Sequence, residues 1–211
     1  MEAADAGFAV ITEGGLTAME DENLVWEEIS TEHIVRDEWI DFRKTAYRFP
    51  DGRIFQPYYS YTRRDYAVIV ASDEEGRFLC VRQFRQGIRQ VTTEFPAGAI
   101  EQKDGENPEE AALRAARREL REETGYVSDS WRHLLTIPSN ATISDNYAYL
   151  FLAENCRKEA DQELDEMELL RVRMHTAAEI DALAARGEFQ QSVHLLAWLL
   201  AKQSAAQPPC P

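Results

Sequence analysis

The chain has few cysteines, few histidines and no long apolar run, and each of these shortages excludes a class of protein or site. It carries three cysteines with no CxxC spacing, which we interpret as reduced thiols of a cytoplasmic protein. Its four histidines lie far apart without an HExxH motif, so we assign none of them to a metal. No apolar run approaches the ~20 residues of a membrane-spanning helix. The acidic N-terminus argues against a signal peptide.

Basic residues are also scarce. Lysine and arginine total 23 against 38 acidic residues, which gives a net charge of −15. Such a field repels nucleic acids and anionic membrane surfaces, so neither is expected as a partner. It also repels a phosphorylated substrate, unless metal ions and local arginines invert the potential at the site.

The 211 residues, 44% of them apolar, suffice for one sizeable core and an appendage. Residues 1–20 show no sustained period and are predicted to be flexible, as is the tail 205–211. Residues 21–62 have strand-like runs around a turn at 50–53 and predict a small N-terminal antiparallel β-sheet. Residues 63–204 form the predicted main domain.

Strand and helix signals alternate through the main domain. The expected strands are 66–71, 78–83, 131–137, 147–153 and 169–174. Thr176 with Glu179 predicts a capped helix that ends at Gly187, and a final amphipathic helix follows at 191–202. Strands interrupted by one long acidic helix and closed by helices indicate a mixed α/β sandwich.

The acidic helix is the most informative segment. Asn107 is a good N-cap, Pro108 suits the first position, and Gly125 supplies the stop. Near its end, Glu119, Glu122 and Glu123 are spaced i, i+3 and i+4, so they share one face. Their repulsion becomes ligation if a hard cation such as Mg²⁺ binds. A solvated acidic face is the alternative interpretation.

The run RELREETGY at 118–126, which seven intervening residues separate from Glu110, resembles the signature of the Nudix hydrolases. That signature begins with a glycine, but its position here is Asp104. Anchoring on Gly98 and Glu106 instead leaves gaps of seven and eleven residues, where the family pattern has shorter ones. We therefore expect one added helical turn within 111–116, and the roles of Glu106 and Glu110 stay open.

Four further pieces resemble the ADP-ribose and nucleotide-sugar pyrophosphatase branch of that family. They are RQFR at 82–85, EFPAG at 94–98, LDEME at 164–168 and ARGE at 185–188. The resemblance covers residues 47–202 and implies the Nudix fold, an α/β/α sandwich with a mixed sheet. It also implies a homodimer, because members of this branch commonly exchange the N-terminal sheet.

The resemblance assigns the metal ligands. Glu119 and Glu123 would bridge Mg²⁺ ions, with Mn²⁺ as an alternative. Glu122 would add a ligand directly or through water, and Ala97 would contribute its carbonyl oxygen. Arg118 lies four residues from Glu122 and can orient that carboxylate, although an isolated salt bridge is the alternative.

An acidic residue before the last strand would act as the general base for the attacking water. Asp165, Glu166 and Glu168 are candidates. We prefer Glu166 as the base, with Glu168 as its partner or as a metal ligand.

Three residues are expected to bind the substrate. Arg85 matches a position that contacts the phosphates, and Glu94 belongs to the same branch motif. Ala141 falls where ADP-ribose-specific members carry a proline, while Pro138 lies three residues earlier. ADP-ribose is therefore the first candidate, and other nucleotide sugars stay open.

The predicted function is Mg²⁺-dependent hydrolysis of a nucleoside diphosphate sugar, first ADP-ribose, to a nucleoside monophosphate and a sugar phosphate. Tyr58, Tyr59 and Tyr61 are candidates for stacking on the base. The alternative is a catalytically silent Nudix-fold sensor of nucleotide sugars. All three carboxylates of the signature are present, which favours the enzyme.

Overall fold

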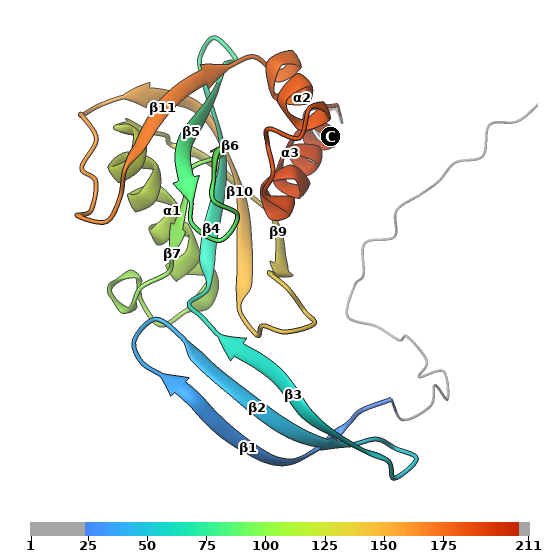
Figure 1. Cartoon of the computed structure of the whole chain (residues 1–211). Helices are drawn as coiled ribbons and strands as arrows, with labels where there is room; N and C mark the ends of the chain where they lie inside the picture. The colour runs from blue at the N-terminus through green and yellow to red at the C-terminus, as the bar shows by residue number, and fades with distance from the viewer. Residues whose placement is uncertain (1–23, 207–211) are drawn as a thin grey trace, which may run out of the picture.

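A computed structural model describes residues 24–206, and it describes side chains as far as residue 204. The strands of the described residues form two separate sheets (Figure 1). The predicted flexible segment 1–20 and most of the predicted tail 205–211 lie outside the described residues.

The first sheet confirms the small antiparallel sheet predicted near the N-terminus. Its strands β1 (Glu27–Arg36), β2 (Asp41–Arg48) and β3 (Ile54–Thr62) pair in sequence order. The predicted turn closes between β2 and β3, where Gly52 adopts a φ of 87° and its amide donates to the Phe49 carbonyl. This sheet lies beneath the main body in Figure 1.

The second sheet has eight strands. The path β11-β5-β4-β10-β8 carries three side branches, in which β6 pairs with β5, β7 with β4 and β9 with β10. Strand β10 runs parallel to β4 and every other pairing is antiparallel, so the sheet is mixed as predicted. The bounds are β4 Tyr66–Asp73, β5 Phe78–Arg85, β6 Gln90–Glu94, β7 Ala97–Ala99, β8 Tyr126–Val127, β9 Ser130–Pro138, β10 Tyr147–Lys158 and β11 Leu170–His175.

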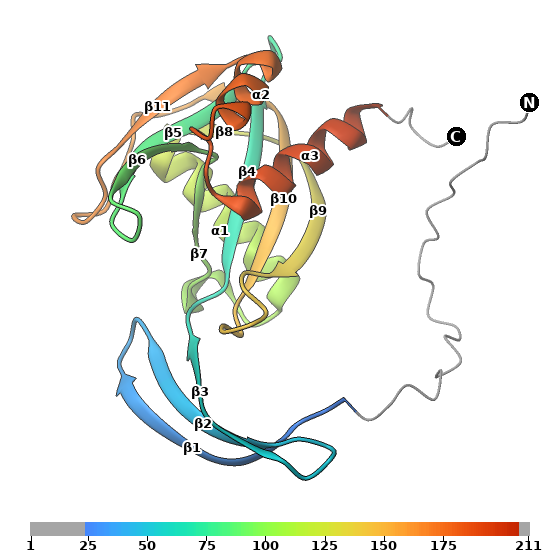
Figure 2. The ribbon, with the colours of Figure 1, turned by 45° about the vertical axis from the view of Figure 1, so that its right-hand side comes forward.

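Helices cover both faces of this sheet. Helix α1 (Pro108–Thr124) follows a short 3-10 turn, Gln102–Asp104, and packs on one face. Helices α2 (Ala177–Ala185) and α3 (Ser192–Ala206) pack on the other, as Figures 1 and 2 show. The arrangement confirms the predicted α/β/α sandwich.

Strand alternation divides the core into two layers. In β4, Val68 and Val70 face α2 and α3, whereas Ile69 faces α1. In β10, Leu150 joins the first layer and Phe151 joins the second. Because these central strands are covered on both faces, they read as continuous apolar runs.

The predicted caps of α1 and α2 are confirmed, whereas α3 begins one residue later and ends four residues later than predicted. The Asn107 side chain accepts a hydrogen bond from the Glu110 amide at 3.1 Å, which fixes the start of α1. Gly125 ends the helix with a φ of 75°, a left-handed conformation that favours glycine. Thr176 and Glu179 form the predicted capping box of α2.

Within residues 24–206, no helix has both the length and the apolar content that a bilayer crossing requires.

The core predicts a large asymmetry between two neighbouring residues of α3. Trp198 is 2% exposed and its indole N–H donates to Asp181, whereas Leu199 is 59% exposed. We expect Trp198→Ala to lower the free energy of unfolding by about 3–5 kcal/mol, because it opens a cavity. Leu199→Ala should change it by about 0.5 kcal/mol or less. Urea unfolding of both variants measures the difference, and similar losses would contradict the packing described.

Candidate metal and substrate site

Three carboxylates converge at the end of α1. Glu119 and Glu123 come from one face of the helix, and Glu168 comes from the loop before β11. One oxygen from each lies within 4.8 Å of the others. Glu119 and Glu123 are buried and Glu168 is partly buried. The structure therefore brings together three of the residues that the sequence assigned to metal.

The surroundings of Glu119 and Glu123 disfavour the ionised form of each carboxylate. Burial raises the pKa of Glu119 to about 7, although Arg118 opposes the shift. Burial raises the pKa of Glu123 well above its usual value, and the nearby charges of Glu119 and Glu168 add to the effect. Hard carboxylate oxygens at this spacing match the ligands that Mg²⁺ takes, so the donor set fits a divalent cation.

Strand β7 lies against the carboxylate cluster. The Ala97 amide donates to Glu123 Oε2 at 3.0 Å, which holds that carboxylate against the strand. A Cβ atom on Gly98 would lie 2.0 Å from Glu119 Cδ, so no side chain fits there. Gly98, on which one of the two registers of the signature was anchored, therefore lies directly against Glu119. The role of the Ala97 carbonyl oxygen stays a prediction.

Arg118 orients the acidic face. Its guanidinium donates to Glu119 Oε1 at 2.7 Å and to Glu122 Oε2 at 2.8 Å, and it also binds the Ala99 carbonyl at 2.9 Å. Burial lowers its pKa, but these carboxylates and Asp104 outweigh that and raise it overall. The predicted pairing of Arg118 with Glu122 is therefore present. Glu122 itself stands beside the three-carboxylate cluster rather than within it.

Asp104 is a site residue that the sequence reasoning missed. Its buried carboxylate accepts from Arg118 at 3.2 Å and also from the Glu101 amide. It occupies the register position where the family pattern has glycine, and that mismatch was the available signal. Glu106 and Glu110 are both exposed, and Glu110 pairs with Arg114 at 3.3 Å.

Arg85 and Glu94 form a two-pronged ion pair next to the carboxylate cluster. Arg85 Nε donates to Glu94 Oε1 at 2.9 Å, Nη2 donates to Oε2, and Thr92 also donates to this carboxylate. Burial alone would raise the pKa of Glu94, but Arg85 outweighs it and the pKa is lowered. Glu94 is fully buried while about a third of the Arg85 side chain is exposed. Glu94 thus holds Arg85 in place with its outer side open to a ligand.

Two cavities meet at Arg85 and Ala97. The larger, of about 470 Å³, reaches from the small sheet to the foot of α3, and the smaller, of about 400 Å³, contains Glu123 and Glu168. Ser139 and Asn146 bring the loop 138–146 to the larger cavity. Aromatic and basic side chains also line it, namely Trp39, Tyr61, Arg63, Arg64 and Tyr66.

Trp39 is a second residue that the sequence reasoning missed. It lies in the turn between β1 and β2, it is 59% exposed, and the Arg64 guanidinium lies 5.8 Å from its ring. Of the three tyrosines considered for base stacking, Tyr61 lines the larger cavity. Tyr58 packs among the aromatic rings of the small sheet, and Tyr59 stacks on Phe42.

Two other predicted residues lie apart from these cavities. Ala141 lines a third cavity of about 290 Å³ beside Trp26 and Tyr58. Glu166 is exposed in a turn of the loop before β11, two residues before Glu168. The structure thus gathers Arg85, Glu94 and the metal candidates, but it leaves Ala141 and Glu166 outside the group.

Known proteins resemble this chain in sequence and in fold. The chain is 36% identical over 105 residues to an ADP-ribose pyrophosphatase of Bacillus subtilis (strain 168), which covers 49% of this chain and 54% of that protein. It is 37% identical over 110 residues to an ADP-sugar pyrophosphatase of Mus musculus, covering 47% and 48%. The matched part spans about half the length of these curated relatives.

A crystal structure of an ADP compounds hydrolase shares the fold, with a TM-score of 0.72 and 21% sequence identity over 85% of this chain and 93% of that one. Residues 62–199, which hold every carboxylate described above, match the NUDIX domain. The chain therefore belongs to the Nudix family.

Proposed function

We propose that this chain is a Mg²⁺-dependent pyrophosphohydrolase, which splits a nucleoside diphosphate sugar into a nucleoside monophosphate and a sugar phosphate. ADP-ribose is the first candidate substrate. The observation that carries the proposal is the convergence of Glu119, Glu123 and Glu168 beside an outward-facing Arg85. Buried carboxylates placed this close cost free energy unless a cation joins them.

The proposed division of labour follows from charge. Glu119, Glu123 and Glu168 would hold the cation, Glu122 would complete its shell through water, and the Ala97 carbonyl would add a ligand. A bound divalent cation neutralises phosphate charge and lowers the pKa of a coordinated water. Arg118 keeps Glu119 and Glu122 in the required rotamers.

We propose that the arginines of the larger cavity bind the diphosphate. Arg85 presents a guanidinium that Glu94 fixes from behind, and a fixed guanidinium binds phosphate oxygens in a defined orientation. Arg63 and Arg64 add charge to the larger cavity, which offsets the acidic field of the chain. Trp39 and Tyr61 supply aromatic faces for the base at the small-sheet end of this cavity.

The choice of general base depends on position. Glu168 reaches the cluster, and its carboxylate also accepts from the Asp165 amide at 3.1 Å, which steadies the loop. We therefore propose Glu168 as a ligand that can also hold the attacking water. Glu166, the residue preferred from the sequence, remains the second candidate if the loop turns it inward.

We further propose a homodimer through the small sheet, in a cytoplasmic protein. Five apolar side chains of that sheet are between 42% and 57% exposed, namely Ile29, Ile34, Val35, Ile54 and Phe55. A second copy would cover them. The two cysteines among the described residues, Cys80 and Cys156, are free and buried, which suits a reducing compartment.

The metal proposal predicts a sharp loss of activity on removing one carboxylate charge. Glu123→Gln should lower kcat/KM for ADP-ribose more than ~100-fold, because even outer partners of metal ligands are worth ~10–100-fold. Glu110→Gln, on the exposed face of the same helix, is the control and should stay within about twofold. Excess chelator should abolish wild-type turnover. Full activity in the Glu122→Gln/Glu123→Gln double variant would refute the proposal.

Two variants separate the candidate bases. We expect Glu168→Gln to lower kcat more than ~100-fold, since it removes a carboxylate from the cluster, and Glu166→Gln to lower it less than about tenfold. Steady-state kinetics with Mg²⁺ decides between them. The reverse order would return the role of base to Glu166.

The dimer proposal predicts a molar mass in solution about twice the 24.2 kDa of one chain. Ile29→Glu/Ile34→Glu should yield monomers, because it places charges in the covered face. Leu199→Glu adds a charge at an exposed apolar position of α3 and should leave the dimer intact. Light scattering after size exclusion measures all three proteins, and a monomeric wild type would rule the dimer out.

A further inference from the structure

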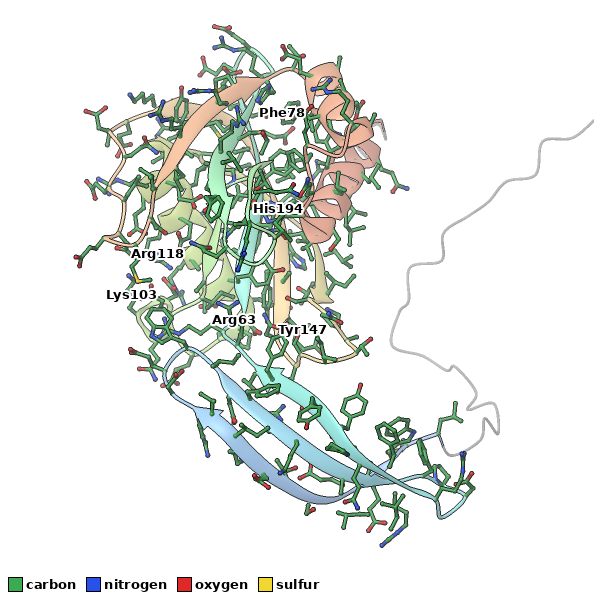
Figure 3. The ribbon with its side chains drawn as sticks, in the orientation of Figure 1. Arg63, Phe78, Lys103, Arg118, Tyr147 and His194 are labelled. Carbon is green, nitrogen blue, oxygen red and sulfur yellow. The ribbon has the colours of Figure 1, made fainter. Side chains whose placement is uncertain are left out.

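His194 is a buried polar residue that the proposed mechanism does not use. It lies in the first turn of α3, it is 3% exposed, and it lines the larger cavity. Figure 3 shows it between the start of α3 and the sheet. The Arg85–Glu94 pair lies close enough to influence its charge.

One hydrogen bond fixes the tautomer of this ring. The Phe95 amide donates to His194 Nδ1 at 3.2 Å, so Nδ1 carries no proton. Burial lowers the pKa of His194 to about 4, although Glu94 opposes the shift, so the ring is neutral near pH 7. The single proton of the neutral ring therefore sits on Nε2.

The other ring nitrogen of His194, Nε2, is available to a ligand. Within residues 24–204, no hydrogen bond joins Nε2 to another residue. The fully buried side-chain nitrogen and oxygen atoms without a partner in that range are Ser139 Oγ and His175 Nε2. Nε2 of His194 is not among them, so it keeps contact with the cavity. A fixed donor that faces a cavity without a partner from the protein is available to an acceptor on a ligand.

The residues that line the larger cavity indicate which part of a ligand would contact Nε2 of His194. The charged groups, Arg63, Arg64 and Arg85, suit phosphates, and the aromatic faces at the small-sheet end suit the base. Beside His194, Arg85 is paired with Glu94, so their charges compensate each other, and the neutral Gln191 and Ser139 also line this cavity. Neutral donors match neutral oxygens, because a hydroxyl needs no countercharge.

We propose that His194 is a specificity-determining residue, whose Nε2–H donates to a hydroxyl oxygen of the sugar attached to the second phosphate. The identity of the ligand rests on the proposed function. His194 would then distinguish a nucleoside diphosphate sugar from the free nucleoside diphosphate, which lacks that hydroxyl.

Two isosteric substitutions separate the two ring nitrogens. Asparagine places an oxygen near the position of Nδ1, so His194→Asn keeps the acceptor for Phe95 and removes the outer donor. Glutamine places an amide nitrogen near the position of Nε2, so His194→Gln keeps the donor and loses the acceptor. A role in packing alone predicts the greater damage from His194→Gln in every assay.

The binding probes are the α,β-methylene analogues of ADP-ribose and of ADP, used with Mg²⁺, since a P–C–P link resists hydrolysis. His194→Asn should weaken binding of the ADP-ribose analogue about five- to tenfold and leave the ADP analogue within about twofold. His194→Gln should bind both nearly as the wild type does, but with a lower Tm. Unchanged affinities in His194→Asn, or equal weakening of both probes, would overturn the proposal.

A measurement on the wild type covers the case in which neither variant folds. Nitrogen-15 NMR of the histidine rings should show one ring protonated at Nε2 whose Nε2–H shifts with the ADP-ribose analogue and not with the ADP analogue. Equal shifts with both probes would reject the assignment. Because these assays need no turnover, an inactive wild type would refute the proposed function without deciding the role of His194.

Discussion

The closeness of three carboxylates in a largely buried place constrains the rest of the main domain. Glu119 and Glu123 stay there because α1 is anchored at both ends and because β7 and Arg118 hold their oxygens. Helix α1 is positioned in turn by the apolar layer that it shares with β4 and β10. A large part of the core therefore serves to hold like charges closer together than they would stay in water.

A second constraint joins the small sheet to the main domain. Arg43 of β2 donates to Asp145 at 2.7 Å, and Thr62 of β3 donates to the same carboxylate at 2.6 Å. The Tyr61 amide donates to the Ile143 carbonyl at 2.8 Å. The loop 138–146 is thereby fastened to β3, and the larger cavity has walls from both sheets. The orientation of the small sheet thus shapes the larger cavity.

Local rules predicted the fold well, and contacts distant in sequence explain the gaps. Asn107, Gly125 and Thr176 carry their own capping chemistry, and β4 and β10 are long apolar runs, so the sequence identified all of them. Strands β7 and β8 have three and two residues, too short for a period to show, and they exist through pairing with β4 and β10.

The candidate site likewise contains features that local rules predict and features that they do not. Helical spacing predicted the shared face of Glu119 and Glu123, but no local rule could show that Asp104 turns back to Arg118. Nor could a rule place Trp39 in the same cavity as Arg85, because the two belong to different sheets. The sequence placed Glu166 and Glu168 before the last strand, and β11 does begin after them at Leu170, but no local rule shows that Glu168 is the one that joins the cluster.

The contact between Gly98 and Glu119 limits how this sequence can drift. A methyl group at position 98 would occupy the space of the Glu119 carboxylate, and the backbone there is tied to β4 by strand pairing. Any descendant that gains a side chain at position 98 must therefore also shorten or move Glu119. A side chain at position 98 of a related sequence would thus indicate that the Glu119 carboxylate no longer lies where it does here.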